Sequence, residues 1–174
     1  MSLTSTRLRR QRRCVPGDRR IAIVVFDDLQ PLDLVGPHEV FTGANSAEER
    51  RGRPAPYDVS VVAVAPGPIR TSSGLTLHVD RPLPTEPVDT ILVVGGPGAC
   101  EVRHDERLTG WLRTASRSAR RTCSVCTGAF VLASAGILDG RRATTHWSRA
   151  RQLRREHPRV VVDPEPLFVQ DGSV

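Results

Sequence analysis

Short apolar runs, separated by polar stretches with glycine and proline, organise this chain. Residues 21–26 and 91–94 are uninterrupted apolar runs rich in β-branched side chains, a pattern typical of strands buried on both faces of a parallel sheet. We expect further strands at 57–64, 122–125, 160–162 and 167–169, and a short extended excursion over 69–79. Helices are expected at 34–44, where Pro37 disturbs the first turn, at 104–121, at 128–135, and from Ser148 to Pro158. This alternation predicts an α/β protein with a parallel, doubly wound sheet.

Charge is distributed unevenly along the 174 residues, whose net charge is +6. The first 20 residues hold seven arginines and one carboxylate, whereas residues 21–174 hold 18 arginines and 18 carboxylates. We therefore expect a disordered Arg-rich tail at 1–18 and one domain at 19–174, which lacks the surplus of positive charge that nucleic-acid binding needs. The tail is either an arm that contacts nucleic acid or acidic partners, or an extension without function.

Apolar runs and cysteines indicate the compartment. No apolar run is long enough to cross a membrane, and no apolar stretch of a secretory signal follows the arginines, so we expect a cytoplasmic protein without a membrane partner. The four cysteines are then reduced thiols: Cys14, Cys100, Cys123 and Cys126. The Cys123–Cys126 spacing allows a redox dithiol. A zinc site would need a second ligand pair, which does not follow, so we expect no metal and no cofactor.

A candidate nucleophile lies where a predicted strand meets a predicted helix. Cys126 ends the strand and Gly128 opens the small apolar helix, which is the layout of a nucleophile elbow. The helix N-terminus is expected to lower the pKa of this thiol. Backbone N–H groups at Gly96 and Thr127 are candidates for an oxyanion hole. On spacing alone, Cys126 is alternatively a buried apolar residue, and Gly95-Gly96 an ordinary turn.

Five segments carry a resemblance to a known family. The chain resembles the ThiJ/PfpI superfamily, with its class I glutamine-amidotransferase-like fold, in Cys126-Thr127-Gly128-Ala129-Phe130 and in 139–147. Segments 36–41, 70–77 and 166–172 resemble the branch found as the N-terminal domain of AraC-type transcription regulators, close to isonitrile hydratases. The resemblance covers residues 19–174 and implies an α/β fold, a flavodoxin-like three-layer sandwich with a mostly parallel sheet.

The resemblance implies roles for three side chains. The family's nucleophile falls on Cys126, and its acidic partner, a carboxylate that hydrogen-bonds the thiol, falls on Asp33. His146 matches a histidine that lies near the site in several branches. Read without the family, Asp33 is equally a helix N-cap, and His146 a structural or interface residue. The protease branch has histidine where this chain has Thr127, which argues against peptidase activity.

The end of the sequence also bears on the function expected. Asp171-Gly172 is a strong hairpin signal, yet only two residues follow it. We expect a domain that stops before its last strand and helix and exposes apolar residues at 137–138 and 168–169. The resemblance then implies the small-molecule-sensing, dimerising domain of an AraC-family regulator, a homodimer that contacts DNA only through a C-terminal helix-turn-helix absent from this chain. The alternative is a free-standing cysteine-dependent hydratase or amidohydrolase acting on a small C–N substrate.

Overall fold

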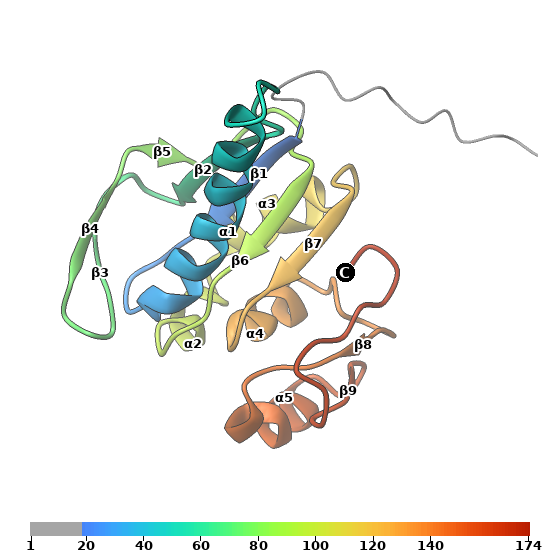
Figure 1. Cartoon of the computed structure of the whole chain (residues 1–174). Coiled ribbons are helices and arrows are strands. Elements are labelled where there is room, and N and C mark those ends of the chain that lie inside the picture. The colour runs from blue at the N-terminus through green and yellow to red at the C-terminus, as the bar shows by residue number, and fades with distance from the viewer. Residues whose placement is uncertain (1–18) are drawn as a thin grey trace, which may run out of the picture.

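A parallel sheet forms the centre of the computed structural model, which describes residues 19–174 (Figure 1). Its strand order is β5–β2–β1–β6–β7, and every pairing is parallel. The strands are β1 (Arg19–Val24), β2 (Tyr57–Ala63), β5 (Arg81–Pro82), β6 (Thr90–Val93) and β7 (Arg121–Ser124). The tail expected at 1–18 lies outside the described residues.

Helices cover both faces of this sheet. Figure 1 shows α1 (Pro31–Glu49) on one face and α3 (Glu106–Ala115) with α4 (Gly128–Ser134) on the other. Short segments complete the chain: α2 (Ala99–Val102), the 3₁₀ turn η1 (Trp147–Arg149) and α5 (Ala150–Glu156). The predicted flavodoxin-like α/β architecture is confirmed.

Two small ladders lie outside the main sheet. The excursion predicted at 69–79 is an antiparallel hairpin of β3 (Gly67–Arg70) and β4 (Thr76–Val79). The other ladder pairs β8 (Arg142–Ala143) with β9 (Val161–Val162) in parallel.

The core lies between the sheet and its helices. Ile23 of β1 and Ile91 of β6 are completely buried, as are Leu108 of α3 and Leu132 of α4. All four residues of β6 are buried, which confirms the prediction that this apolar run is covered on both faces. The central strands therefore hold their carboxyl ends, where the candidate site lies, on a rigid frame.

Helix α1 is longer than predicted. It begins at Pro31, a residue suited to the first helical position, and continues to Glu49 with Pro37 inside it. The helix predicted at 34–44 was therefore too short at both ends. Asn45 explains the extension, because its side chain donates to the carbonyl of Tyr57 at 2.8 Å and accepts from the N–H of Tyr57 at 3.0 Å. These bonds hold the helix end on β2.

The C-terminal prediction was partly wrong. Residues 167–169 form no strand, and the relative solvent exposure of Leu167 is 101% and that of Phe168 is 80%. Leu138, also expected to be exposed, is 1% exposed and packs in the core. The predicted turn does form, with two hydrogen bonds between the backbones of Asp171 and Val174. The Ser173 carbonyl accepts from the N–H of Thr122, so this turn lies along the edge of β7.

Candidate functional site

Cys126 lies in a strained turn between β7 and α4. Its φ of 54° is in the left-handed region, which among the described non-glycine residues only Asp28 shares. Strain of this kind costs about 1–3 kcal/mol and is typical of functional turns. Gly128 permits the turn, because a Cβ there would lie 2.4 Å from the Val93 carbonyl oxygen of β6. The backbone therefore has the form of the predicted elbow.

Asp33 reaches this turn from the first turn of α1. Gln30 is the N-cap of that helix, so the N-cap alternative for Asp33 was wrong. Instead its Oδ2 accepts the N–H of Gly95 at 3.1 Å, and its carboxyl group is hydrogen-bonded to the Cys126 thiol. Gly95 makes this approach possible, because a Cβ there would lie 2.8 Å from both Asp33 Oδ2 and Cys126 Cβ.

Burial raises the pKa of the Cys126 thiol, and the nearby Asp33 charge raises it further. The neighbouring Thr127, chiefly through its backbone N–H, acts in the opposite direction without overcoming these two effects. The expectation of a lowered pKa was therefore wrong. The pKa is raised because the thiol is half-buried beside a carboxylate, and both conditions disfavour the thiolate.

Asp33 is perturbed in the same direction. Burial raises the pKa of its carboxyl group, although the bonds from Gly95 and Cys126 and the charge of His146 each lower it. Burial therefore raises the pKa of both groups above their ordinary values.

Thr127 and Gly96 make a reciprocal contact that the sequence did not reveal. The Thr127 hydroxyl accepts from the N–H of Gly96 at 2.8 Å and donates to the carbonyl of Gly96 at 2.9 Å. The Gly96 N–H is therefore engaged, and the Thr127 N–H is directed at the thiol. The two donors expected to form an oxyanion hole already have partners.

The segment just before η1 also contacts the elbow. Thr145 donates from its hydroxyl to the Cys126 carbonyl at 2.8 Å, a contact that sequence reasoning missed although Thr145 lies in a segment that carries the resemblance. His146 is exposed, bonds Ser148 through Nδ1 at 2.8 Å, and stacks on Trp147. Within residues 19–174 no hydrogen bond joins His146 to Cys126. The histidine's only link to the pair in that part of the chain is electrostatic, since it acts weakly to lower the pKa of Asp33.

Two features, a metal-ligand cluster and a membrane-spanning helix, are absent from residues 19–174. No three side chains of the His, Cys, Asp and Glu types gather there as metal ligands would. No helix in that part of the chain is long and apolar enough to cross a membrane. The remaining thiols of that part differ in burial: Cys123 is partly buried on β7, where burial raises its pKa, and Cys100 is exposed.

Residues 19–174 match the model of the DJ-1/PfpI family over their whole length. The chain belongs to the DJ-1/PfpI family. In fold it is similar to a ThiJ/PfpI family protein from Pseudomonas syringae, with a TM-score of 0.76 and 23% identity over 99% of this chain and 67% of that one. This family membership agrees with the resemblance seen in the sequence.

Three relatives show which kinds of protein in this family are similar to the chain. An uncharacterized protein in the cpoL 5' region of Streptomyces lividans is 41% identical over 82% of this chain and 97% of its own length. Isonitrile hydratase from Pseudomonas putida is 35% identical over 74% of this chain and 53% of its own. The HTH-type transcriptional regulator CdhR from Pseudomonas aeruginosa is 35% identical over 67% of this chain and 34% of its own. The chain thus spans about half of the hydratase and a third of the regulator.

Proposed function

We propose that this domain binds a small molecule at the Cys126–Asp33 pair and serves as the sensing domain of an HTH-type transcriptional regulator. One observation carries the proposal: the N–H groups of Gly95, Gly96 and Thr127 are engaged by Asp33, Thr127 and Cys126. Acyl transfer needs free donors aimed at a developing oxyanion. A site without them favours reversible binding.

The polarity of the pair defines the ligand class. A thiol that keeps its proton can donate a hydrogen bond, and the half-buried carboxylate beside it disfavours an anion. The pair suits a small uncharged molecule with a hydrogen-bond acceptor, such as a nitrile, an isonitrile or a carbonyl compound. The similarity to CdhR supports the sensing role.

The rest of the regulator follows from charge and symmetry. Residues 21–174 carry equal numbers of arginines and carboxylates, so specific DNA contacts would belong to a separate helix-turn-helix domain. A regulator that reads two half-sites works as a dimer, and we propose a homodimer. Sedimentation of the purified chain tests this assembly, and a monomer at micromolar concentration contradicts it.

A hydratase is the second candidate, because one feature favours it. Asp33 and Cys126, which are in hydrogen-bonded contact, supply what hydration of an isonitrile needs first. Asp33 takes the thiol proton and passes it to the terminal carbon as Cys126 Sγ adds to that carbon, which gives a thioimidate without an oxyanion. Water then adds to the same carbon, its proton goes to nitrogen, and loss of the thiol releases the formamide. The similarity to isonitrile hydratase supports this reading.

One experiment separates the candidates. The purified chain is incubated with cyclohexyl isocyanide, and formation of N-cyclohexylformamide is followed by proton NMR, with Cys126→Ala and Asp33→Asn in parallel. Turnover lost in both variants establishes the hydratase. Saturable binding to the wild type without turnover, lost in Cys126→Ala, supports the sensor for this ligand class. Neither turnover nor binding, for this probe and for a panel of uncharged nitriles and carbonyl compounds, overturns both readings.

A further inference from the structure

The connection from β5 to β6 crosses the sheet without a helix. β5 lies beyond β2 and β6 lies beyond β1, so the chain between Pro82 and Thr90 must run back across both strands. Crossovers between parallel strands usually take about a dozen residues or more and contain a helix. Residues 83–89 make this one without a helix, with prolines at 84 and 87 and bends at 85, 86 and 89. We call residues 83–89 the strap.

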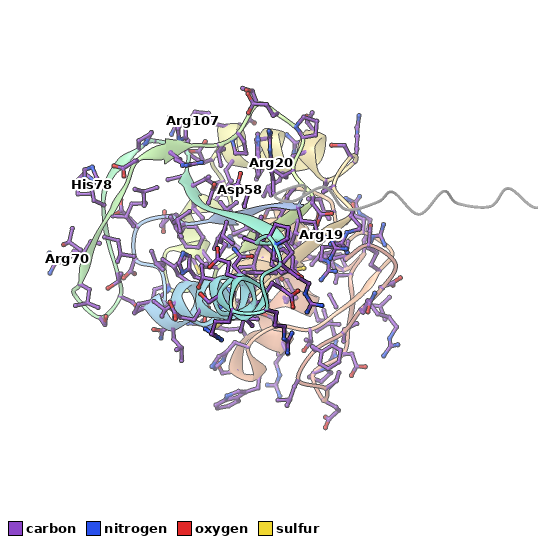
Figure 2. All side chains as sticks on the ribbon, turned by 45° about the horizontal axis from the view of Figure 1, so that its top comes forward. Arg19, Arg20, Asp58, Arg70, His78 and Arg107 are labelled. Atoms are coloured by element: carbon purple, nitrogen blue, oxygen red, sulfur yellow. The ribbon has the colours of Figure 1, made fainter. Side chains whose placement is uncertain are left out.

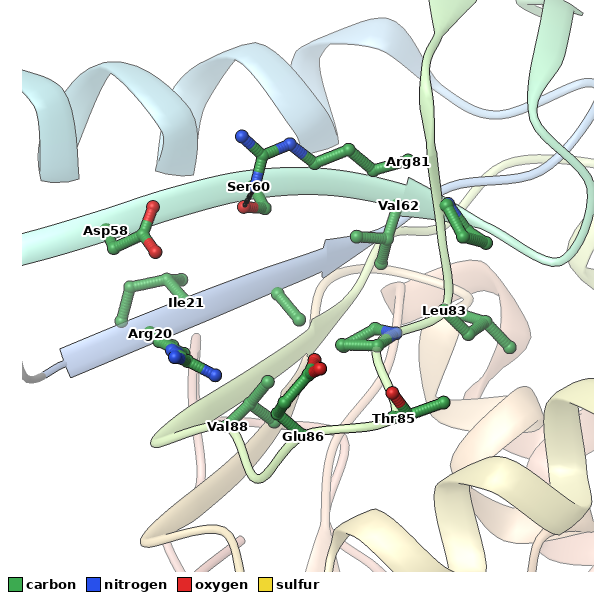
Figure 3. A pocket seen from close by; sticks show the side chains of 13 residues that line it. Arg20, Ile21, Asp58, Ser60, Val62, Arg81, Leu83, Thr85, Glu86 and Val88 are labelled. Atoms are coloured by element: carbon green, nitrogen blue, oxygen red, sulfur yellow. Dashed lines mark hydrogen bonds between the residues drawn. The ribbon is translucent and has the colours of Figure 1, made fainter.

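The strap lies on the face of the sheet opposite α1. Helix α1 packs on the face that presents Tyr57, whose ring contacts Phe41 edge-on at 5.1 Å. Side chains alternate along a strand, so Asp58 and Ser60 project to the other face, where they line one space together with strap residues such as Glu86 and Val88 (Figure 3). A single non-helical segment is thinner than a helix and leaves space beneath it.

Contacts near both ends fix the strap. The indole N–H of Trp111 on α3 donates to the Pro84 carbonyl at 2.8 Å. The Asp89 carboxylate accepts two hydrogen bonds from Arg120, at 2.8 and 2.6 Å. With two prolines limiting its backbone, the strap holds the space beneath it open in a preformed shape.

This space is a cavity of about 580 Å³, within the roughly 300–1,000 Å³ typical of sites for small molecules. Ala22 and Val62 belong to the sheet side, and Leu83 and Val88 to the strap side. None of its lining residues belongs to the Cys126 site.

Four charged side chains line this open cavity, two of each sign, and all four residues are exposed to solvent. Arg20 and Asp58 are register partners on β1 and β2 and lie at the same end of the molecule (Figure 2). Arg81 comes from β5 and donates one hydrogen bond, to Ser60 at 3.1 Å, while Glu86 points from the strap toward the strands (Figure 3). Within residues 19–174, the side chains of Arg20, Asp58 and Glu86 form no ion pair and no hydrogen bond.

We propose that this cavity binds a small zwitterion of the amino-acid type. Its carboxylate would pair with Arg20 and Arg81, and its ammonium group with Asp58 and Glu86. An ion of one sign would leave the two lining charges of the same sign facing it, whereas a zwitterion pairs with all four. The apolar residues of the cavity accommodate an aliphatic side chain. This site is independent of the function proposed for Cys126.

The test begins with thermal-shift measurements of the full chain against the twenty L-amino acids. The amino acid with the largest shift is then measured by calorimetry beside its decarboxylated amine and its N-acetyl derivative. We expect binding of the amino acid, and at least about tenfold weaker binding of both analogues, because each lacks one charge. Amide NMR shifts should appear at Ala22, Ser60 and Val88 and not at Cys126.

Variants locate the site. Arg81→Ala and Glu86→Gln should each weaken binding about tenfold or more, whereas the exposed controls Arg151→Ala and Glu101→Gln should match the wild type. Binding should also survive Cys126→Ala, which keeps this proposal separate from the one for the thiol site. The proposal is overturned if no amino acid binds, if either analogue binds as well as its parent, or if Cys126→Ala abolishes binding while Arg81→Ala does not.

Discussion

Removing the Asp33 charge should make Cys126 a stronger nucleophile at neutral pH. The Asp33 carboxyl is hydrogen-bonded to the thiol and, after burial, is the main influence that raises its pKa. Asp33→Asn removes the negative charge and keeps an oxygen that can accept the N–H of Gly95. The substitution should therefore lower the pKa of Cys126 without dismantling the elbow.

The size of the effect follows from electrostatics. Two unit charges roughly 4 Å apart interact by about 1 kcal/mol in water and about 4 kcal/mol in the environment of a protein surface. For the half-buried Cys126, this corresponds to a rise in thiolate fraction between about fivefold and several hundredfold. A less basic thiolate is also a weaker nucleophile, by about half of the gain on a logarithmic scale. Alkylation of Cys126 should therefore become about twofold to thirtyfold faster.

The assay is pulsed alkylation with iodoacetamide between pH 6 and 9, followed by peptide mapping of each cysteine. In the wild type we expect the exposed Cys100 to react before Cys126, whose thiol favours its protonated form. Cys100 then serves as an internal reference in every sample. Asp80→Asn, an exposed carboxylate beside His78, is the matched control and should leave Cys126 at the wild-type rate. A rate at Cys126 that is unchanged or slower in Asp33→Asn would refute the coupling between these two groups.

Three further predictions concern the packing around the site and the strap. Thr127→Val removes both hydrogen bonds to Gly96, so the free energy of unfolding in urea should fall by about 1–3 kcal/mol, with Thr127→Ser close to wild type. Gly128→Ala puts a methyl group 2.4 Å from a carbonyl oxygen and should cost about 3 kcal/mol or more, whereas Gly43→Ala, in open space on α1, should gain up to about 1 kcal/mol, both read from thermal unfolding. Burial acts to raise the pKa of Asp89, but bonds from Arg120 and Thr90 hold it below 3.8, so Asp89 stabilises the fold above that pH and the gain is lost in acid. In Asp89→Asn the fall of stability on acidification should be smaller when unfolding is measured across pH 2–6.

Each of these three predictions has an outcome that would contradict it. Equal unfolding free energies for Thr127→Val and Thr127→Ser would show that the hydroxyl does not hold Gly96. A melting temperature of Gly128→Ala at or above that of Gly43→Ala would contradict the close approach of α4 to β6. An acid profile of Asp89→Asn that matches the wild type would remove Asp89 from the groups that stabilise the fold near neutral pH.

The sequence alone was enough for the architecture and for the elbow. Apolar runs such as 21–26 have no polar face, so they form strands only where helices cover both sides of a sheet, and alternation with helices makes that sheet parallel. A strand that leads through Cys126 into Gly128 has few alternatives to a tight turn. These are local properties, because they depend on residues close together in the chain.

Tertiary structure decided the rest, because the remaining properties depend on segments that meet only in the fold. Burial and Asp33, 93 positions away in the chain, raise the pKa of Cys126. The helix that begins just after Cys126 had suggested a lowered pKa, because it was the only influence visible in the local sequence. Residues 167–169 have the composition of a strand but lack a partner, and a strand requires one. The cavity beneath the strap exists because the strand order places β2 and β1 between β5 and β6, which no local pattern encodes.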